Sequence, residues 1–150
     1  MDLVQVDGAD LRLARLFQLY VYEWSALVPI RIGDDGHFAD EELCEYGDDD
    51  RVACLVVDDD APAGFALATR DEDGTWHVDE FFILAGARRR GLGTVAAAAL
   101  FASRPGRWTL TVRPENPSGL SFWRSVLPSA EESIERGDDD IVRTRLSFVI

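Results

Sequence analysis

The sequence contains no lysine, so all 15 residues of the lysine-plus-arginine count are arginines. This absence excludes a Walker A phosphate loop and a Schiff-base lysine, because both need a lysine amine. Only two cysteines occur, Cys44 and Cys54, and we expect buried thiols rather than a disulfide because no secretory leader precedes them. The two histidines do not cluster with other ligand types, so we expect no metal site.

Long hydrophobic runs and excess positive charge are also missing. The longest apolar run, residues 95–102, is too short to cross a bilayer, and the acidic residues 1–7 contain no leader, so we expect a cytoplasmic protein. The net charge of −13 disfavours nucleic acid and anionic membranes as partners. It favours a cationic substrate, or it serves only solubility. The length of 150 residues predicts one domain over residues 1–150.

The spacing of apolar residues changes from helical to alternating and back along the chain. It predicts the order β, α, a short helix, three antiparallel strands, α, β, α and a closing hairpin. The expected strands are residues 3–6, 52–57, 64–69, 76–84, 108–112, 132–136 and 141–150. The first expected helix begins after Asp10 and ends before Pro29, and a short helix with Asp40 as its cap covers residues 40–46. Two further helices are expected at residues 94–103 and 117–126.

The most informative segment, residues 81–94, is an apolar strand that enters an arginine and glycine turn and then a helix. Gly91 and Gly93 let the backbone bend sharply and approach a ligand closely. The helix beginning near Thr94 leaves its first N–H groups unpaired, with the positive end of its dipole exposed. We therefore expect a phosphate group to bind at this turn.

This turn, Arg88-x-x-Gly91-x-Gly93, together with the strand order resembles the GNAT family of acyl-CoA-dependent N-acyltransferases. The resemblance implies a single-domain α/β (α+β) acyl-CoA N-acyltransferase-like fold, with a mixed, mostly antiparallel sheet of about six to seven strands flanked by helices. It also implies acetyl-CoA as cosubstrate. The pantetheine arm would pair with Phe81, Phe82 and Ile83. Arginine charge including that of Arg88, and the N–H groups of Arg89, Arg90, Gly91, Leu92, Gly93 and Thr94, would hold the pyrophosphate.

A second match to the family is the segment 116–123, in which an asparagine opens a helix. By resemblance, Asn116 would bond the pantetheine arm, with Phe122 and Trp123 also at the cofactor. Many family members carry a tyrosine at the position of Trp123, where its hydroxyl serves the leaving thiolate. An indole N–H is not a usable acid, so Ser125, a water molecule or no group at all would take that role.

Acylation needs a neutral amine, so a base must remove a proton from an ammonium. Glu80 lies where the family strand carries a bulge and is either a substrate-site carboxylate or an ion-pair partner. His77 lies where some members place a strand glutamate, and it is otherwise a cross-strand histidine. Glu23 is a third candidate, beside Tyr20 and Trp24, which are expected mainly in the core.

The expected function is direct transfer of an acetyl group from acetyl-CoA to a primary amine of a small molecule or peptide. A second hypothesis is a binding module that keeps the acyl-CoA site without turnover. A dinucleotide fingerprint at Gly91-x-Gly93-x-x-Ala96 and a plain surface patch of arginines are weaker readings of the same turn. The sequence leaves open the acceptor, the acyl chain and whether the chain forms a homodimer.

Overall fold

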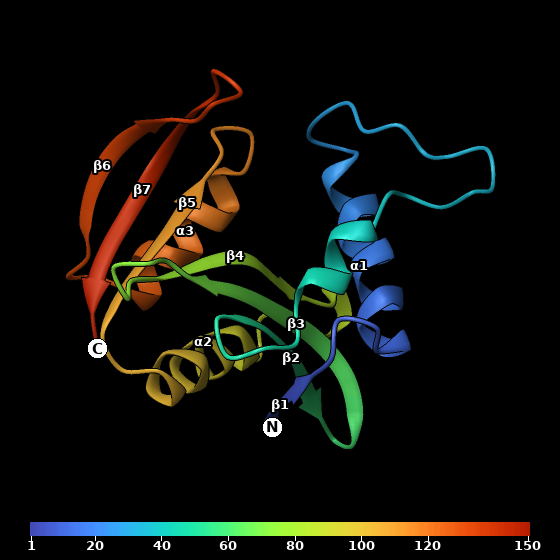
Figure 1. Ribbon diagram of the computed structural model, residues 1–150, viewed down its shortest axis with the longest axis horizontal. Coiled ribbons are helices and arrows are strands. Elements are labelled where there is room, and N and C mark those ends of the chain that lie inside the picture. Colours follow the sequence, from blue (N-terminus) through green and yellow to red (C-terminus); the bar gives the residue numbers. More distant parts are fainter.

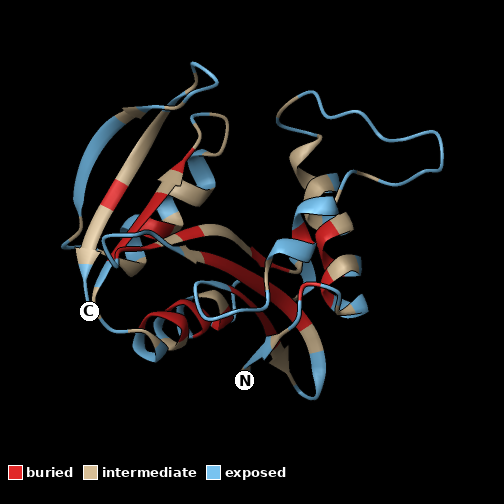
Figure 2. Cartoon of the chain, viewed as in Figure 1, coloured by how far each residue is buried: buried red, intermediate tan, exposed pale blue.

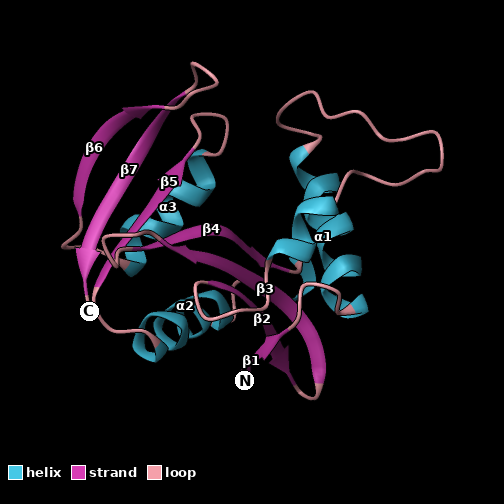
Figure 3. Ribbon diagram, viewed as in Figure 1, coloured by secondary structure: helices cyan, strands magenta, loops and turns pink.

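The computed structural model describes all 150 residues and has the predicted order of strands and helices (Figures 1 and 3). The helix predicted to begin at Thr94 begins at Leu92 instead, directly after Gly91, which has the left-handed conformation. Asp40 makes no side-chain cap, and the segment after it is a 3-10 helix. The elements are β1 (Asp2–Val6), α1 (Leu11–Trp24), η1 (Glu41–Glu45), β2 (Arg51–Asp58), β3 (Ala61–Arg70), β4 (Trp76–Ile83), η2 (Ala85–Ala87), α2 (Leu92–Ser103), β5 (Arg107–Val112), α3 (Pro117–Val126), β6 (Glu131–Arg136) and β7 (Val142–Val149).

The seven strands form one mixed sheet in the order β1-β2-β3-β4-β5-β7-β6, which confirms the predicted mixed, mostly antiparallel sheet of about six to seven strands. Its single parallel pair, β4 with β5, extends only from Trp76 opposite Trp108 to Val78 opposite Leu110. Beyond Val78 the two strands separate, so the last part of β4 has no strand partner on that side. The sheet is therefore open at its centre.

Helices cover both faces of the sheet, α1 on one face and α2 with α3 on the other (Figure 1). Leu13 and Phe17 of α1 pack with Phe65 and Phe82 in a buried cluster, and a larger cluster around Trp108 lies under α2 and α3. Figure 2 shows the buried residues concentrated in the central strands and the helix faces that touch them. Each such side chain contributes about 1.5–3 kcal/mol through burial. None of the helices is both long enough and apolar enough to span a membrane.

A bulge in β4 lies at the point where β4 and β5 separate. In the pairing with β3, Leu67 opposes Glu80 and Ala68 opposes Val78, which leaves Asp79 as the extra residue. Side chains normally alternate along a strand, but the bulge places both Asp79 and Glu80 on the face covered by α1. The predicted position of the bulge is confirmed.

Candidate functional site

The turn between β4 and α2 presents a row of free backbone donors. The N–H groups of the six consecutive residues 89–94 have no partner in the protein, because the first bond of the helix runs from Val95 N–H to the Gly91 carbonyl. Gly91 adopts a φ of +78°, and a Cβ added there would meet nothing within 4 Å. Arg89 also has a positive φ of +62°, which is uncommon for a residue with a side chain. This row of donors fits an anion such as a pyrophosphate.

The three arginines of the turn have different surroundings. Arg88 donates from Nε to the Ile83 carbonyl at 2.7 Å and from Nη2 to Glu23 at 2.6 Å. Arg90 forms an ion pair with Asp58 at 3.3 Å. Arg89 is exposed and makes no ion pair. It is therefore the arginine whose charge is not already neutralised beside the row of N–H groups.

The free edge of β4 lies next to this turn. Leu84 N–H donates to the Ala63 carbonyl on β3, so the N–H and the carbonyl of Ile83 point away from β3, toward the opening. The carbonyl already accepts from Arg88, so the N–H is the group of Ile83 that is left free. Phe81 stacks on Phe122 of α3 with ring centroids 5.9 Å apart. Trp123 is only 7% exposed and packs edge-to-face on Phe81, so it supports Phe81 from the core.

Asn116 acts as the cap of α3. Its side-chain oxygen accepts from Gly119 N–H at 2.9 Å and from the Ser118 hydroxyl at 3.1 Å. A Cβ on Gly119 would collide with the Asn116 side chain, so the two residues are closely fitted. Any contact with a pantetheine arm is left to the amide nitrogen of Asn116.

A cavity of about 330 Å³ lies on the α1 face, where the bulge of β4 meets the end of α1. This volume suits a small molecule or the end of a longer one. It contains three carboxylates, those of Glu42, Asp79 and Glu80. The lining residues are Phe17, Tyr20, Val21, Trp24, Val28, Ile30, Glu42, Asp79, Glu80, Thr111, Arg113 and Arg143.

Among the three carboxylates of this cavity, Glu80 has the pKa that lies furthest from its ordinary value. Burial raises its pKa to about 7, although a hydrogen bond from the Tyr20 hydroxyl acts in the opposite direction. Burial and the nearby Glu80 charge raise the pKa of Tyr20 in turn, so the phenol stays protonated and donates. A carboxyl group with a pKa near 7 can take up and release a proton at neutral pH, as a general base must.

Asp79 belongs to a separate hydrogen-bonded group beside Glu80. Its Oδ2 accepts from the Thr69 hydroxyl at 2.6 Å and from the Tyr46 hydroxyl at 3.0 Å. Burial raises the pKa of Asp79, while these donors lower it. The negative charges of Glu42 and Asp79 add to the rise in the pKa of Glu80.

The other two candidate bases do not line the cavity that contains Glu80. The Nδ1 atom of His77 lies 2.8 Å from the Thr109 hydroxyl, between β4 and β5, and burial lowers its pKa. Glu23 is paired with Arg88 and borders a second cavity of about 560 Å³, between α1, the β2–β3 turn and η2. The structure therefore separates the three predicted bases, and only Glu80 faces the carboxylate cavity.

Several residues of this cavity had no signal in the sequence. Tyr20 was expected mainly in the core, and its hydroxyl instead meets Glu80, a residue far away along the chain. Thr111, Arg113 and Arg143 form a wall that only the pairing of β5 with β7 brings together. Nothing in their spacing distinguishes them from solvent-facing strand residues. No group of three or more histidine, cysteine, aspartate or glutamate side chains has the arrangement of a metal site.

Comparisons with known proteins agree with this geometry. The family model described as acetyltransferase (GNAT) family matches residues 14–126. An acetyltransferase from Thermus thermophilus has a similar structure, with a TM-score of 0.72 and 20% identity over 99% of this chain and 96% of its own. No curated protein sequence matches the chain.

Two further solved structures are similar and carry more specific descriptions. An aminoglycoside 6'-N-acetyltransferase complexed with coenzyme A has a TM-score of 0.71 at 16% identity, covering 99% of this chain and 97% of its own. A ribosomal-protein alanine N-acetyltransferase from Escherichia coli has a TM-score of 0.69 at 13% identity, covering 99% and 93%. At these identities the likeness shows the fold alone.

Proposed function

The chain belongs to the GNAT acetyltransferase family, and from this membership we propose that it transfers an acetyl group from acetyl-CoA directly to a primary amine. The observation that carries the proposal is the arrangement around one strand. The end of β4 leads into the free N–H groups of residues 89–94, and its bulge turns Glu80 into a cavity of small-molecule size.

The cofactor half of the proposal rests on backbone groups. The row of N–H groups at the start of α2, with the positive end of the helix dipole, would bind the pyrophosphate, and Arg89 would add its charge. The free edge of β4 near Ile83 would bind the pantetheine arm. When bound, acetyl-CoA supplies the thioester carbonyl that an amine can attack. Peptide N–H groups of the same edge would stabilise the developing oxyanion.

The acceptor half rests on Glu80. Its carboxylate would take a proton from the ammonium of the acceptor, directly or through a water molecule, and Tyr20 would hold it in place. Aligning the amine with the thioester supplies much of the rate enhancement. The carboxylates of the cavity and the net charge of −13 favour an acceptor that carries positive charge.

A binding module without turnover is the second candidate, and the burial of Trp123 favours it. The residue that would replace the usual tyrosine is in the core, 7% exposed, and offers no acid to the leaving thiolate. Ser125 donates to the Phe122 carbonyl at 2.7 Å, so its hydroxyl proton is also occupied. Under the catalytic proposal the thiolate leaves without a side-chain acid.

The test is calorimetric titration of the protein with acetyl-CoA, followed by measurement of thiol release from acetyl-CoA with a panel of primary amines. Saturable binding and amine-dependent thiol release are the expected results. Binding without thiol release for any amine would favour the binding module. No binding of acetyl-CoA would remove both candidates, and NADH in a parallel titration checks the weaker dinucleotide interpretation.

A further inference from the structure

The cavity that contains Glu80 has a basic wall opposite its carboxylates. Thr111 and Arg113 lie two residues apart on β5 and its continuation, so their side chains share the face covered by α1. Arg143 of β7 lines the same wall. The carboxylates come from β4 and η1, and the arginines come from beyond the opening between β4 and β5. The cavity is therefore divided by charge.

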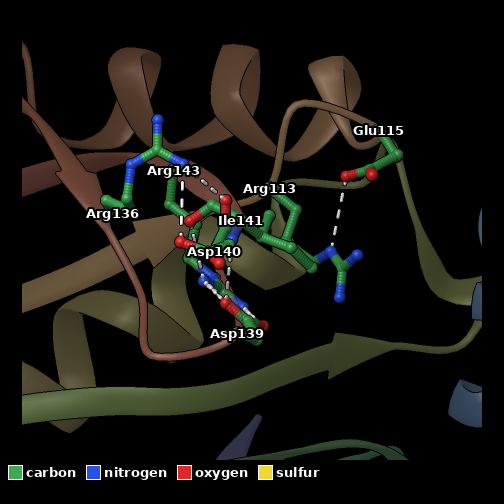
Figure 4. Close-up of polar contacts among 7 residues, drawn as sticks. All are labelled: Arg113, Glu115, Arg136, Asp139, Asp140, Ile141 and Arg143. Atoms are coloured by element: carbon green, nitrogen blue, oxygen red, sulfur yellow. Dashed lines mark hydrogen bonds and ion pairs between the residues drawn. The ribbon is translucent and has the colours of Figure 1, made fainter.

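Arg113 is the arginine of this wall whose donors are free. Its Nε contacts Glu115 Oε2 at 3.3 Å, and its two terminal amino groups have no partner in the protein. Figure 4 shows Arg113 extending away from the pair formed by Arg143 and Asp139, with a single contact to Glu115. The Thr111 hydroxyl also makes no hydrogen bond within the protein. Two adjacent side chains thus present unused donors to one cavity.

Arg143, in contrast, is held by the turn that joins β6 to β7. Its Nη1 donates to Asp139 Oδ1 at 2.8 Å and to the Ile141 carbonyl at 3.2 Å (Figure 4). Arg143 lines the cavity, and Asp139 balances its charge. The two terminal amino groups of Arg113 are therefore the guanidinium donors of the basic wall that remain for a ligand, because those of Arg143 are both bonded to Asp139.

We propose that the acceptor of the acetyl group carries an anionic oxyacid group, a carboxylate or phosphate, that binds Arg113 and Thr111 while its amine lies at Glu80. This inference rests on the proposed function and narrows its substrate class to small amino acids, peptide ends or amino phosphates. The planar guanidinium of Arg113 matches two oxygens of such a group. A purely cationic acceptor would leave these donors unpaired.

The test compares amines that differ only in charge at the far end. The panel consists of β-alanine with β-alaninamide, 4-aminobutanoate with 4-aminobutanamide, glycylglycine with its amide, and 2-aminoethylphosphonate for the phosphate class. We expect at least one acid to have a kcat/KM about 10- to 100-fold above its amide, as for a charge-assisted hydrogen-bonded pair. A larger value for the phosphonate than for every carboxylate would assign the site to phosphate.

Two variants assign the effect to the basic wall. Arg113→Met is expected to lower kcat/KM for the acid to the level of its amide, so that the preference for the acid disappears. Arg145→Met is the matched control, because Arg145 of β7 is paired with Glu135 of β6 and does not line the cavity. It should keep the preference. Equal turnover of acids and amides by the wild type, or a preference that survives Arg113→Met, overturns the proposal.

A failure of this inference is distinguishable from a failure of the proposed function. If amides are acetylated as well as acids, the transferase proposal stands and the anion site is wrong. If no amine is acetylated, direct calorimetric titration with the same acids decides the site. Saturable binding that Arg113→Met abolishes supports it, and no binding to the wild type overturns it.

Discussion

Replacing Glu80 by glutamine removes the carboxylate proposed as the base and leaves an amide oxygen for the Tyr20 hydroxyl. If Glu80 takes the proton from the acceptor, kcat should fall by about 10²- to 10⁴-fold with acetyl-CoA binding retained. In the wild type, kcat/KM should rise with pH and level off above a pKa of about 7, where Glu80 is ionised. In Glu80→Gln this rise should disappear.

The same ionisation predicts a change in stability. Glu80 has its usual pKa of 4.5 in the unfolded chain and about 7 in the folded protein. Between these values the unfolded chain loses the proton while the folded protein keeps it, so folding stability falls as pH rises and is constant above about pH 7. At about 1.4 kcal/mol for each tenfold change in proton affinity, the loss between pH 5 and pH 8 is about 2–3 kcal/mol.

Urea unfolding of wild type and Glu80→Gln at pH 5 and pH 8 measures this loss. The difference between the free energies of unfolding of the two proteins cancels the contribution of the other titrating groups. The variant should gain about 2–3 kcal/mol relative to wild type between the two pH values. Glu131→Gln, at an exposed position on β6, is the matched control and should show no such gain. An identical pH dependence in wild type and Glu80→Gln would refute the argument that burial raises the pKa of Glu80.

Three further substitutions test the rest of the site. Tyr20→Phe removes the donor that lowers the pKa of Glu80, so the rise of kcat/KM should move to higher pH, and an unmoved rise would contradict the contact. Gly91→Ala puts a side chain at a φ of +78° and a methyl group beside the free N–H groups, at a cost of about 1–2 kcal/mol in strain. Calorimetry should show acetyl-CoA affinity lowered at least tenfold, while Gly86→Ala, also with open space around its Cβ, should bind normally. Trp123→Phe should lower the free energy of unfolding by about 1–2 kcal/mol and leave kcat unchanged, whereas a fall in kcat at every pH would reveal that the indole N–H takes part in the reaction.

The cofactor half of the site could be predicted from the sequence because its signals are local. An apolar strand, two glycines and the start of a helix follow one another within residues 81–94, and the proposed binding uses backbone groups near Gly91. The capping role of Asn116 follows from the proline after it and the helical pattern beyond. The hydrogen-bond partners of the side chains in this half could not be predicted from the sequence. That Arg88 would bond to the Ile83 carbonyl and to Glu23 depends on how α1 lies across the sheet.

The contacts of the proposed acceptor half could not be predicted from the sequence, because each of them joins residues that are far apart in the chain. Tyr20 meets Glu80 only after α1 packs on the sheet, and its helical spacing equally fits a core position. Glu42 follows a long irregular segment, and the apolar residues of that segment have no regular spacing that predicts the path of its backbone. Arg113 and Arg143 share a wall only through the register of β5 with β7.

One extra residue in β4 links the two halves. Val78 faces α2 and α3, so in a regular strand Glu80 would face the same way and Phe82 with it. Because Asp79 is inserted, Glu80 and Phe82 turn to the α1 face instead, and Phe81 turns toward α3. The pairing with β5 ends at the residue before the insertion, which frees the edge that leads to the pyrophosphate turn. The bulge therefore both directs the proposed base into the carboxylate cavity and opens the sheet where the cofactor is proposed to bind. A shift of one residue in this strand would remove both at once.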